Sequence, residues 1–230
     1  RNTMRFSQLI LCTFFLAKSA ASRQHAAHHS LLFNQMPIQS SEVQDSSSND
    51  LPLSTREHWM RIASSANHAI SPCPFAPFGT AIVNHTLSFS DPTHLGELIC
   101  MGVNDNGHSG NPTLHGEMVG IGNCTSILTD PEGLYKLSAS ETKEAWRSFS
   151  LYTTAEVGIP GMQEVVYGTS IEKLIDLGWS QIEIGSQEVF ERAGRLGRKT
   201  EVIGDVLGHE MDKWFEWQFM RRERPEGCER

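Results

Sequence analysis

The alternation of apolar and polar positions becomes regular only from Ser54 onward. Ser54 and Glu57 have the spacing of a helix capping box, and apolar side chains then recur at helical intervals as Trp59, Ile62, Ala63, Ala66 and Ile70. This pattern predicts a helix that ends before Pro72.

Two short runs rich in β-branched residues follow this helix. Residues 77–85 read PFGTAIVNH and residues 96–104 read GELICMGVN, with a turn-rich segment between them. The runs predict a pair of antiparallel strands. After a loop rich in Gly and Asn, residues 113–127 are expected to form a helix with Asn111 as its cap and Pro112 in its first turn.

The rest of the chain alternates between helical and strand-like patterns. We expect helices at residues 138–147, 170–179, 187–196 and 201–219, and strands at residues 150–154, 164–168 and 181–184. Strands separated by helices are typical of an α/β fold with a partly parallel sheet.

The first 53 residues lack this periodicity. From Met4 the chain has a basic residue, an apolar stretch from Leu9 to Ala17 and small residues near Ala21, the pattern of a cleaved secretory signal peptide. An apolar stretch this short does not cross a membrane, which needs roughly twenty residues. We therefore expect a signal peptide at residues 1–21, a disordered linker rich in His and Ser at 22–53, one domain at 54–230 and a secreted protein.

Composition narrows the class of partner. The formal net charge is -8, whereas binding to nucleic acid or to an anionic membrane requires a basic surface. A small neutral or cationic molecule is the better candidate.

In a secreted protein, cysteines can form disulfides and asparagines in suitable motifs can carry glycans. Without the leader four cysteines remain, which allow one or two disulfides that the sequence does not pair: Cys73, Cys100, Cys124 and Cys228. Asn84-His-Thr and Asn123-Cys-Thr are acceptor sequences for N-linked glycans.

The candidate chemistry lies in GNPTLHGEMVGIGNCT, where His115 and Glu117 follow a proline near a predicted helix start. A His-x-Glu tripeptide alone is weak evidence, because the chain contains 10 histidines. Its context is specific: PFGTAIVNH precedes it, and LYTTAE and VVYGTSIEKL follow. In this order the motifs resemble the cytidine and deoxycytidylate deaminase superfamily, especially its guanine, cytosine and tRNA adenosine deaminases and a secreted fungal group. The resemblance covers residues 54–230 and implies a three-layer α/β/α sandwich with a mixed sheet of about five strands.

The resemblance implies a zinc-dependent hydrolytic deaminase of a free nucleobase or nucleoside. In the superfamily, a histidine at the position of His115 binds zinc together with two thiolates of a Pro-Cys-x-x-Cys motif. A glutamate at the position of Glu117 moves a proton from the zinc-bound water to the base and then to the departing ammonia. The resemblance further implies that Asn84 hydrogen-bonds the base, that Phe78 and Asn111 shape the pocket, and that the protein forms a homodimer.

Each of these residues also has an ordinary interpretation. His115 could be a plain helix residue and Glu117 a solvated carboxylate that the helix dipole stabilises. Asn84 could serve only as a glycan acceptor, and a glycan there would obstruct a pocket.

The cysteine half of the zinc motif is absent. Thr154-Ala155-Glu156 is followed directly by VGIPGM, which has no cysteine and contains the two poorest helix formers, Gly and Pro. The strands on either side are expected to be parallel neighbours, and a crossover between such strands usually needs about ten to twelve residues. We therefore expect that this span can neither bridge the strands in the usual way nor supply thiolates, and that the chain must stretch a loop across, give up part of a strand or pair the two runs differently. In each case one crossover helix is lost and apolar surface of the sheet is exposed.

Other residues are poor substitutes for the missing ligands. Cys124 lies half a helical turn out of phase with His115, Cys100 lies in a predicted strand, and His108 would define a new kind of site. We expect weak or no zinc binding. A loss of about a dozen residues between Glu156 and Val157 explains the pattern, through a gene-model error, a splice form or a true deletion. The alternative to an incomplete enzyme is a secreted binding protein without catalytic activity on the same scaffold.

Overall fold

The computed structural model describes residues 51–86, 93, 95–159, 161–196, 199–219, 224–226 and 228. The predicted signal peptide and almost all of the predicted linker lie outside these residues. Among the residues described, no helix combines the length and the apolar character that crossing a membrane requires.

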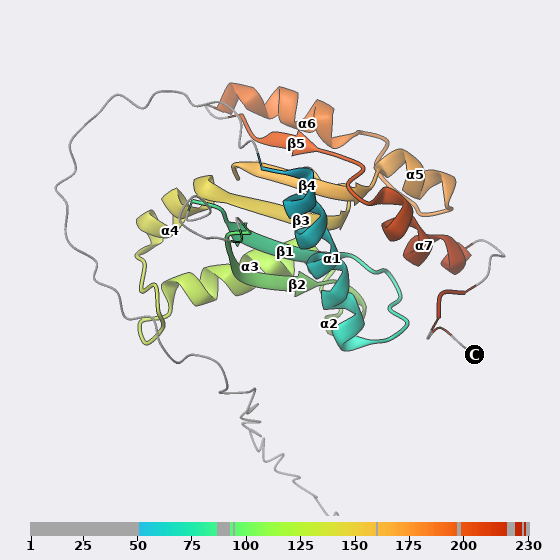
Figure 1. The fold of residues 1–230 in the computed structure, drawn as a ribbon, viewed down its shortest axis with the longest axis horizontal. Helices are drawn as coiled ribbons and strands as arrows, with labels where there is room; N and C mark the ends of the chain where they lie inside the picture. Colours follow the sequence, from blue (N-terminus) through green and yellow to red (C-terminus); the bar gives the residue numbers. More distant parts are fainter. Residues whose placement is uncertain are drawn as a thin grey trace, which may run out of the picture. The chain divides into compact units, whose positions relative to one another are not determined.

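Helices and strands alternate along the described chain as the sequence pattern indicated (Figure 1). The elements are α1 (Leu53–Ile70), β1 (Gly79–Asn84), β2 (Glu97–Val103), α2 (Asn106–Ser109), α3 (Gly116–Thr129), α4 (Ala139–Ala145), η1 (Trp146–Ser148), β3 (Phe149–Ala155), β4 (Glu164–Thr169), α5 (Ile171–Asp176), α6 (Ser186–Ala193), η2 (Gly194–Leu196), β5 (Glu201–Ile203) and α7 (Gly208–Phe219).

A mixed sheet with the strand order β2-β1-β3-β4-β5 forms the centre of the fold. β1 is antiparallel to both β2 and β3, and β4 is parallel to both β3 and β5. The α/β fold with a mixed sheet of five strands is therefore confirmed, as is the antiparallel pairing of the first two strands.

The identity of the last strand differs from the prediction. Residues 181–184 form no strand, and the side chains of Ile182 and Ile184 are 74% and 44% exposed. The fifth strand is instead Glu201–Ile203, where Val202 pairs with Val165 and lies against the core. The prediction of one helix over residues 201–219 was therefore wrong, because the chain pairs with β4 before it turns into α7.

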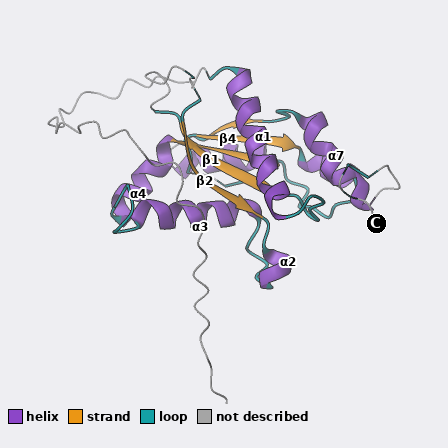
Figure 2. Ribbon diagram, turned by 60° about the horizontal axis from the view of Figure 1, so that its bottom comes forward, coloured by secondary structure: helices purple, strands orange, loops and turns teal. Residues whose placement is uncertain are grey.

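Alternate residues of the strands supply an apolar core on each face of the sheet, and a third apolar cluster forms around Phe78, Trp179 and Phe215. Figure 2 shows helices on both sides of the sheet. On one face α1 and α7 pack against the sheet through Met60, Tyr152 and Met211. On the other face α3, α4 and α6 pack against residues such as Leu151 and Val165. Successive strand residues point to opposite faces, so the alternation seen in the sequence is what places a helical layer on each side.

The helix starts depart from the predicted caps. α1 begins after Pro52 and its cap makes no side-chain hydrogen bond, so the capping box expected at Ser54 does not form. α3 begins one residue after His115 and not at Asn111, whose Oδ1 accepts hydrogen bonds from Thr113. A capping box does form at α4, between Ser138 and Glu141.

The segment between β3 and β4 bridges the two parallel strands, and its described residues, 156–159 and 161–163, form no helix. Ser150 pairs with Glu164 and Ala155 with Thr169, so the chain must return along five residues, or about 17 Å of strand. Residues 156–163, when extended, reach about 26–29 Å. Of the three courses open to this span, the chain takes the loop stretched across. The expectation that so short a span could not join parallel neighbours was wrong, because the usual crossover contains a helix and an extended loop needs fewer residues.

The same segment also covers the sheet. Val157 and Met162 pack against the core beside Phe190 of α6, and Leu151 and Val165 are fully buried. The expected exposure of apolar sheet surface was therefore wrong, because the loop supplies apolar side chains and α6 lies over them.

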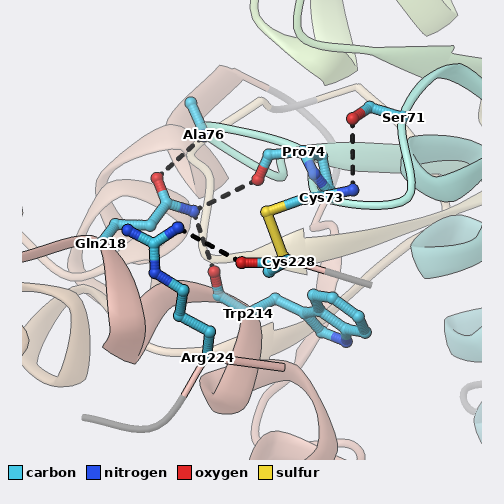
Figure 3. Close-up of a disulfide and its surroundings, with 8 residues drawn as sticks. All are labelled: Ser71, Cys73, Pro74, Ala76, Trp214, Gln218, Arg224 and Cys228. Carbon is cyan, nitrogen blue, oxygen red and sulfur yellow. Dashed lines mark hydrogen bonds between the residues drawn. A yellow bond between two sulfur atoms is a disulfide. The ribbon is translucent and has the colours of Figure 1, made fainter. Parts of the chain in front are cut away.

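Two disulfides form among the described residues. Cys73 pairs with Cys228 and joins the segment after α1 to the segment after α7, with the two Cα atoms 4.7 Å apart (Figure 3). Cys100 of β2 pairs with Cys124 of α3. The pairing that the sequence left open is thus settled, and none of these four sulfur atoms is free to act as a thiolate ligand.

Candidate functional site

The two motif residues and their neighbours meet where α3 begins, near the carboxyl ends of β2 and β3. Phe78 lies just before β1, Asn104 just after β2, and Thr153 near the end of β3. Ligands of open α/β sheets bind beyond the carboxyl ends of the strands. The site therefore has the position that this architecture favours.

Glycines allow α3 to lie directly on the sheet. A Cβ atom on Gly116 would overlap the carbonyl oxygen of Phe78, and one on Gly102 would overlap the backbone of Gly120 and Gly116. This close approach brings Glu117 from the first turn of α3 onto the strand residues below it.

Glu117 is a buried carboxyl group with a specific partner. Its side chain is 4% exposed, and Thr153 Oγ1 donates a 2.6 Å hydrogen bond to its Oε1. Burial raises the pKa of Glu117 above its usual range, while the hydrogen bond from Thr153 and the nearby His115 offset part of that rise. A carboxyl group whose pKa is raised takes up a proton more readily than one in water, as a group that transfers protons must.

His115 is the N-cap residue of α3 and is exposed. Its ring centroid lies 5.7 Å from that of Phe78. The structure therefore brings together three of the five predicted site residues, namely His115, Glu117 and Phe78.

The donor set around His115 does not fit a catalytic zinc ion. Such an ion needs three protein ligands, and no cluster of three or more His, Cys, Asp or Glu side chains suited to a metal occurs in the described part of the chain. Cys100 and Cys124 are bonded to each other, and His108 lies exposed beside Asp105 at 3.4 Å. Metal-dependent chemistry therefore needs ligands that the described part of the chain does not bring to the site.

Asn84 lies away from the other predicted site residues. It pairs with Phe149, whereas Thr80, four residues earlier on β1, pairs with Thr153 beside Glu117. Four residues of strand correspond to about 13 Å. Asn111 is also apart, since it is exposed and its Oδ1 accepts from Thr113.

Two polar residues that the motifs did not single out lie at the site. The backbone N–H of Asn104 donates to Phe78 O at 3.0 Å, and Asn104 Nδ2 donates to Ala76 O at 3.4 Å. Thr80 lies opposite Thr153, and its buried Oγ1 has no hydrogen-bond partner within the described chain. Strand periodicity could have found both, because Thr80 and Thr153 alternate onto the α3 face and Asn104 ends its strand.

Aromatic rings continue outward from Phe78. Its centroid lies 5.6 Å from Trp179 and 5.4 Å from Phe215, and Trp179 in turn lies 6.0 Å from Phe75, which is 71% exposed. Phe78, Trp179 and Phe215 are buried and form one apolar cluster beside the site, so of these rings only Phe75 presents its face to solvent.

Glu156, the acidic residue after the third strand, organises the chain beyond the site. Its carboxylate accepts a 2.7 Å hydrogen bond from Ile171 N, at the start of α5, and another from Ser186 N, at the start of α6. One carboxylate thus satisfies two helix N-termini. The residue has a structural role in this fold.

Replacing Glu117 by glutamine is expected to stabilise the protein by roughly 1–3 kcal/mol at pH 7. A native pKa above the unfolded value means that the native state binds more protons, so wild-type stability falls as pH rises above about 4.5. Glutamine does not ionise and still accepts from Thr153, so the gain should be large at pH 7 and small at pH 4. Urea unfolding at both values measures it.

Glu141→Gln provides the matched control for this measurement. The hydrogen bonds from Ser138 lower the pKa of Glu141, so the exposed carboxylate contributes stability that is present at neutral pH and lost in acid. The two variants should therefore respond to pH with opposite sign. A Glu117→Gln effect that does not change between pH 4 and 7 would contradict the assignment.

Comparison with known proteins finds similarity in structure and none in sequence. No protein-family model matches the chain, and no curated protein matches it. A guanine deaminase from Nitrosomonas europaea is 14% identical, with a TM-score of 0.46 over 72% of this chain and 83% of its own. A tRNA:A34 deaminase is 16% identical, with a TM-score of 0.46 over 68% and 98%. A mutant protein in complex with 8-azaguanine is 15% identical, with a TM-score of 0.48 over 69% and 81%.

Proposed function

We propose that this chain derives from secreted, zinc-dependent deaminases of a nucleobase or nucleoside, and that it keeps the base-facing half of their site without the metal ligands. The observation that carries the proposal is the burial of Glu117, two residues after His115. Its carboxyl group accepts a hydrogen bond from Thr153. A solvated first-turn carboxylate would be exposed, so the ordinary interpretation of Glu117 does not explain its burial.

The remaining residues have roles that suit a planar, neutral ligand. Phe78 forms an apolar wall beside His115, and Glu117 holds or accepts a proton. Asn104 is the better candidate than Asn84 for a hydrogen bond to the base, because it lies beside Phe78. The net charge of -8 disfavours a nucleic acid and favours a free base or nucleoside.

A thermal-shift assay with guanine, cytosine, adenine and cytidine tests the retained base site. A ligand that binds only the native state should stabilise it by about 2.7 kcal/mol at one hundred times its Kd. Asn104→Ala should lose this stabilisation and Asn111→Ala should keep it. Absence of any shift would refute a retained base site, and an unchanged shift in Asn104→Ala would refute the role of Asn104.

Whether the gene product is an enzyme or a binding protein depends on whether the transcript encodes the missing cysteine motif between Glu156 and Val157. The donor set at His115 among the described residues favours a binding protein for this chain, with no ammonia released from a base. A transcript that carries an in-frame Pro-Cys-x-x-Cys at this junction would instead make the enzyme the full product.

The proposed secretion is supported by the two disulfides, and the proposed homodimer is checked by the mass of the purified protein in solution.

A further inference from the structure

We infer that Asn84 carries an N-linked glycan and has no part in binding a base. The inference rests on the secretory route of the proposed function. It starts from Asn84-His85-Thr86, an acceptor sequence at the end of β1.

The position of Asn84 removes the conflict between a glycan and a pocket. Asn84 lies beside Glu97 and Phe149, at the opposite end of β1 from Phe78. A glycan on this residue therefore extends from the end of β1 that lies away from Phe78, and it leaves the site around Glu117 open.

The local geometry suits the acceptor reaction. Asn84 Oδ1 accepts hydrogen bonds from Thr86 N at 3.0 Å and from Thr86 Oγ1 at 2.7 Å, so the side chain forms an Asx turn with the hydroxyl against the amide. Both described side-chain hydrogen bonds of Asn84 are accepted by Oδ1, and neither uses Nδ2, the atom that would carry the sugar. These contacts span three residues, so the chain can form them before it folds.

The chemistry is a transfer from an activated sugar donor, a lipid pyrophosphate oligosaccharide. The bond between the anomeric carbon and the pyrophosphate oxygen breaks, and the electron pair leaves with the lipid pyrophosphate. The anomeric carbon then bonds to Asn84 Nδ2, which gives up one proton.

The second acceptor sequence has a different geometry. Asn123 lies inside α3, where its Nδ2 donates to Met101 O at 3.0 Å. Thr125 Oγ1 donates to Ile121 O and not to the Asn123 amide, and the intervening Cys124 is in a disulfide. Asn123 therefore serves as the matched comparison within the same chain.

Expression of the full chain in a eukaryotic secretory host tests the inference. The secreted protein is treated with peptide N-glycosidase and its mass is measured beside the variants Asn84→Gln, Thr86→Ala and Asn123→Gln. We expect wild type and Asn123→Gln to lose the mass of one glycan, and the other two variants to show no change.

Secreted, disulfide-bonded protein that lacks a glycan at Asn84 would overturn the inference, as would a glycan on Asn123 in its place. A base-induced thermal shift that Thr86→Ala keeps and Asn84→Gln loses would also overturn it, because both variants lack the glycan and only the second changes the side chain at position 84. The zinc and ammonia measurements do not depend on these outcomes, so the glycan can fail while the proposed function stands.

Discussion

Insertion of a helical segment that begins with Pro-Cys-x-x-Cys between Glu156 and Val157 is expected to create a zinc site. The protein should change from almost no bound zinc to about one ion per chain, because two thiolates would join the imidazole of His115. The insertion follows the strand that carries Thr153, the partner of Glu117, so the new sulfur atoms would enter at the edge where the site lies. Metal content of the purified protein, measured after dialysis, gives the result.

A matched insertion with Pro-Ser-x-x-Ser separates the ligands from the added length. It should fold equally well and bind no zinc. Ammonia release from a base should accompany zinc in the cysteine form and should be lost in its Glu117→Gln variant. Stoichiometric zinc in the original chain, or none in the cysteine form when it folds, would contradict the expected arrangement of the site.

Replacing Arg56 by methionine is expected to lower the free energy of unfolding by about 3–5 kcal/mol. Arg56 of α1 donates to Glu164 Oε2 at 2.7 Å, and Glu164 is fully buried in β4. Burial raises the pKa of Glu164 and Arg56 lowers it, so the variant would leave an uncompensated carboxylate inside the sheet. Urea unfolding at pH 7 measures the loss.

The double variant Arg56→Met with Glu164→Gln distinguishes a lost charge partner from lost packing. It should regain most of the stability, since an amide carries no charge to bury. The single variant should also approach wild type as pH falls below about 4.5, where Glu164 takes up its proton in both states. Equal losses in the single and double variants would show that packing of the arginine stem dominates.

The sequence predicted most of the sheet because its signal is local and repetitive. The strands from β1 to β4 follow from patterns within a few residues. The capping box expected at Ser54 does not form, and the one at Ser138 of α4 was not predicted. Residues 181–184 alternate equally well yet form no strand, because pairing depends on which segment can reach β4. Which segment pairs with β4 depends on tertiary contacts, and a window of four residues does not contain that information.

The candidate site was predicted in part for a similar reason. His115 and Glu117 lie close in sequence, so their motif identified them together. The polar residue beside Phe78 depends on which end of a strand faces the site, and Asn84 ends β1 whereas Asn104 directly follows β2. Only the antiparallel register places Asn104 beside Phe78 and Asn84 at the other end.

The disulfide between Cys73 and Cys228 spans 155 positions of the sequence and makes almost the whole domain a covalent ring. A protease that cuts one surface loop inside this ring produces two polypeptides that cannot separate until the bond is reduced. Outside the cell, the two fragments of a nicked molecule would thus stay covalently linked, and the cut would appear only on a reducing gel.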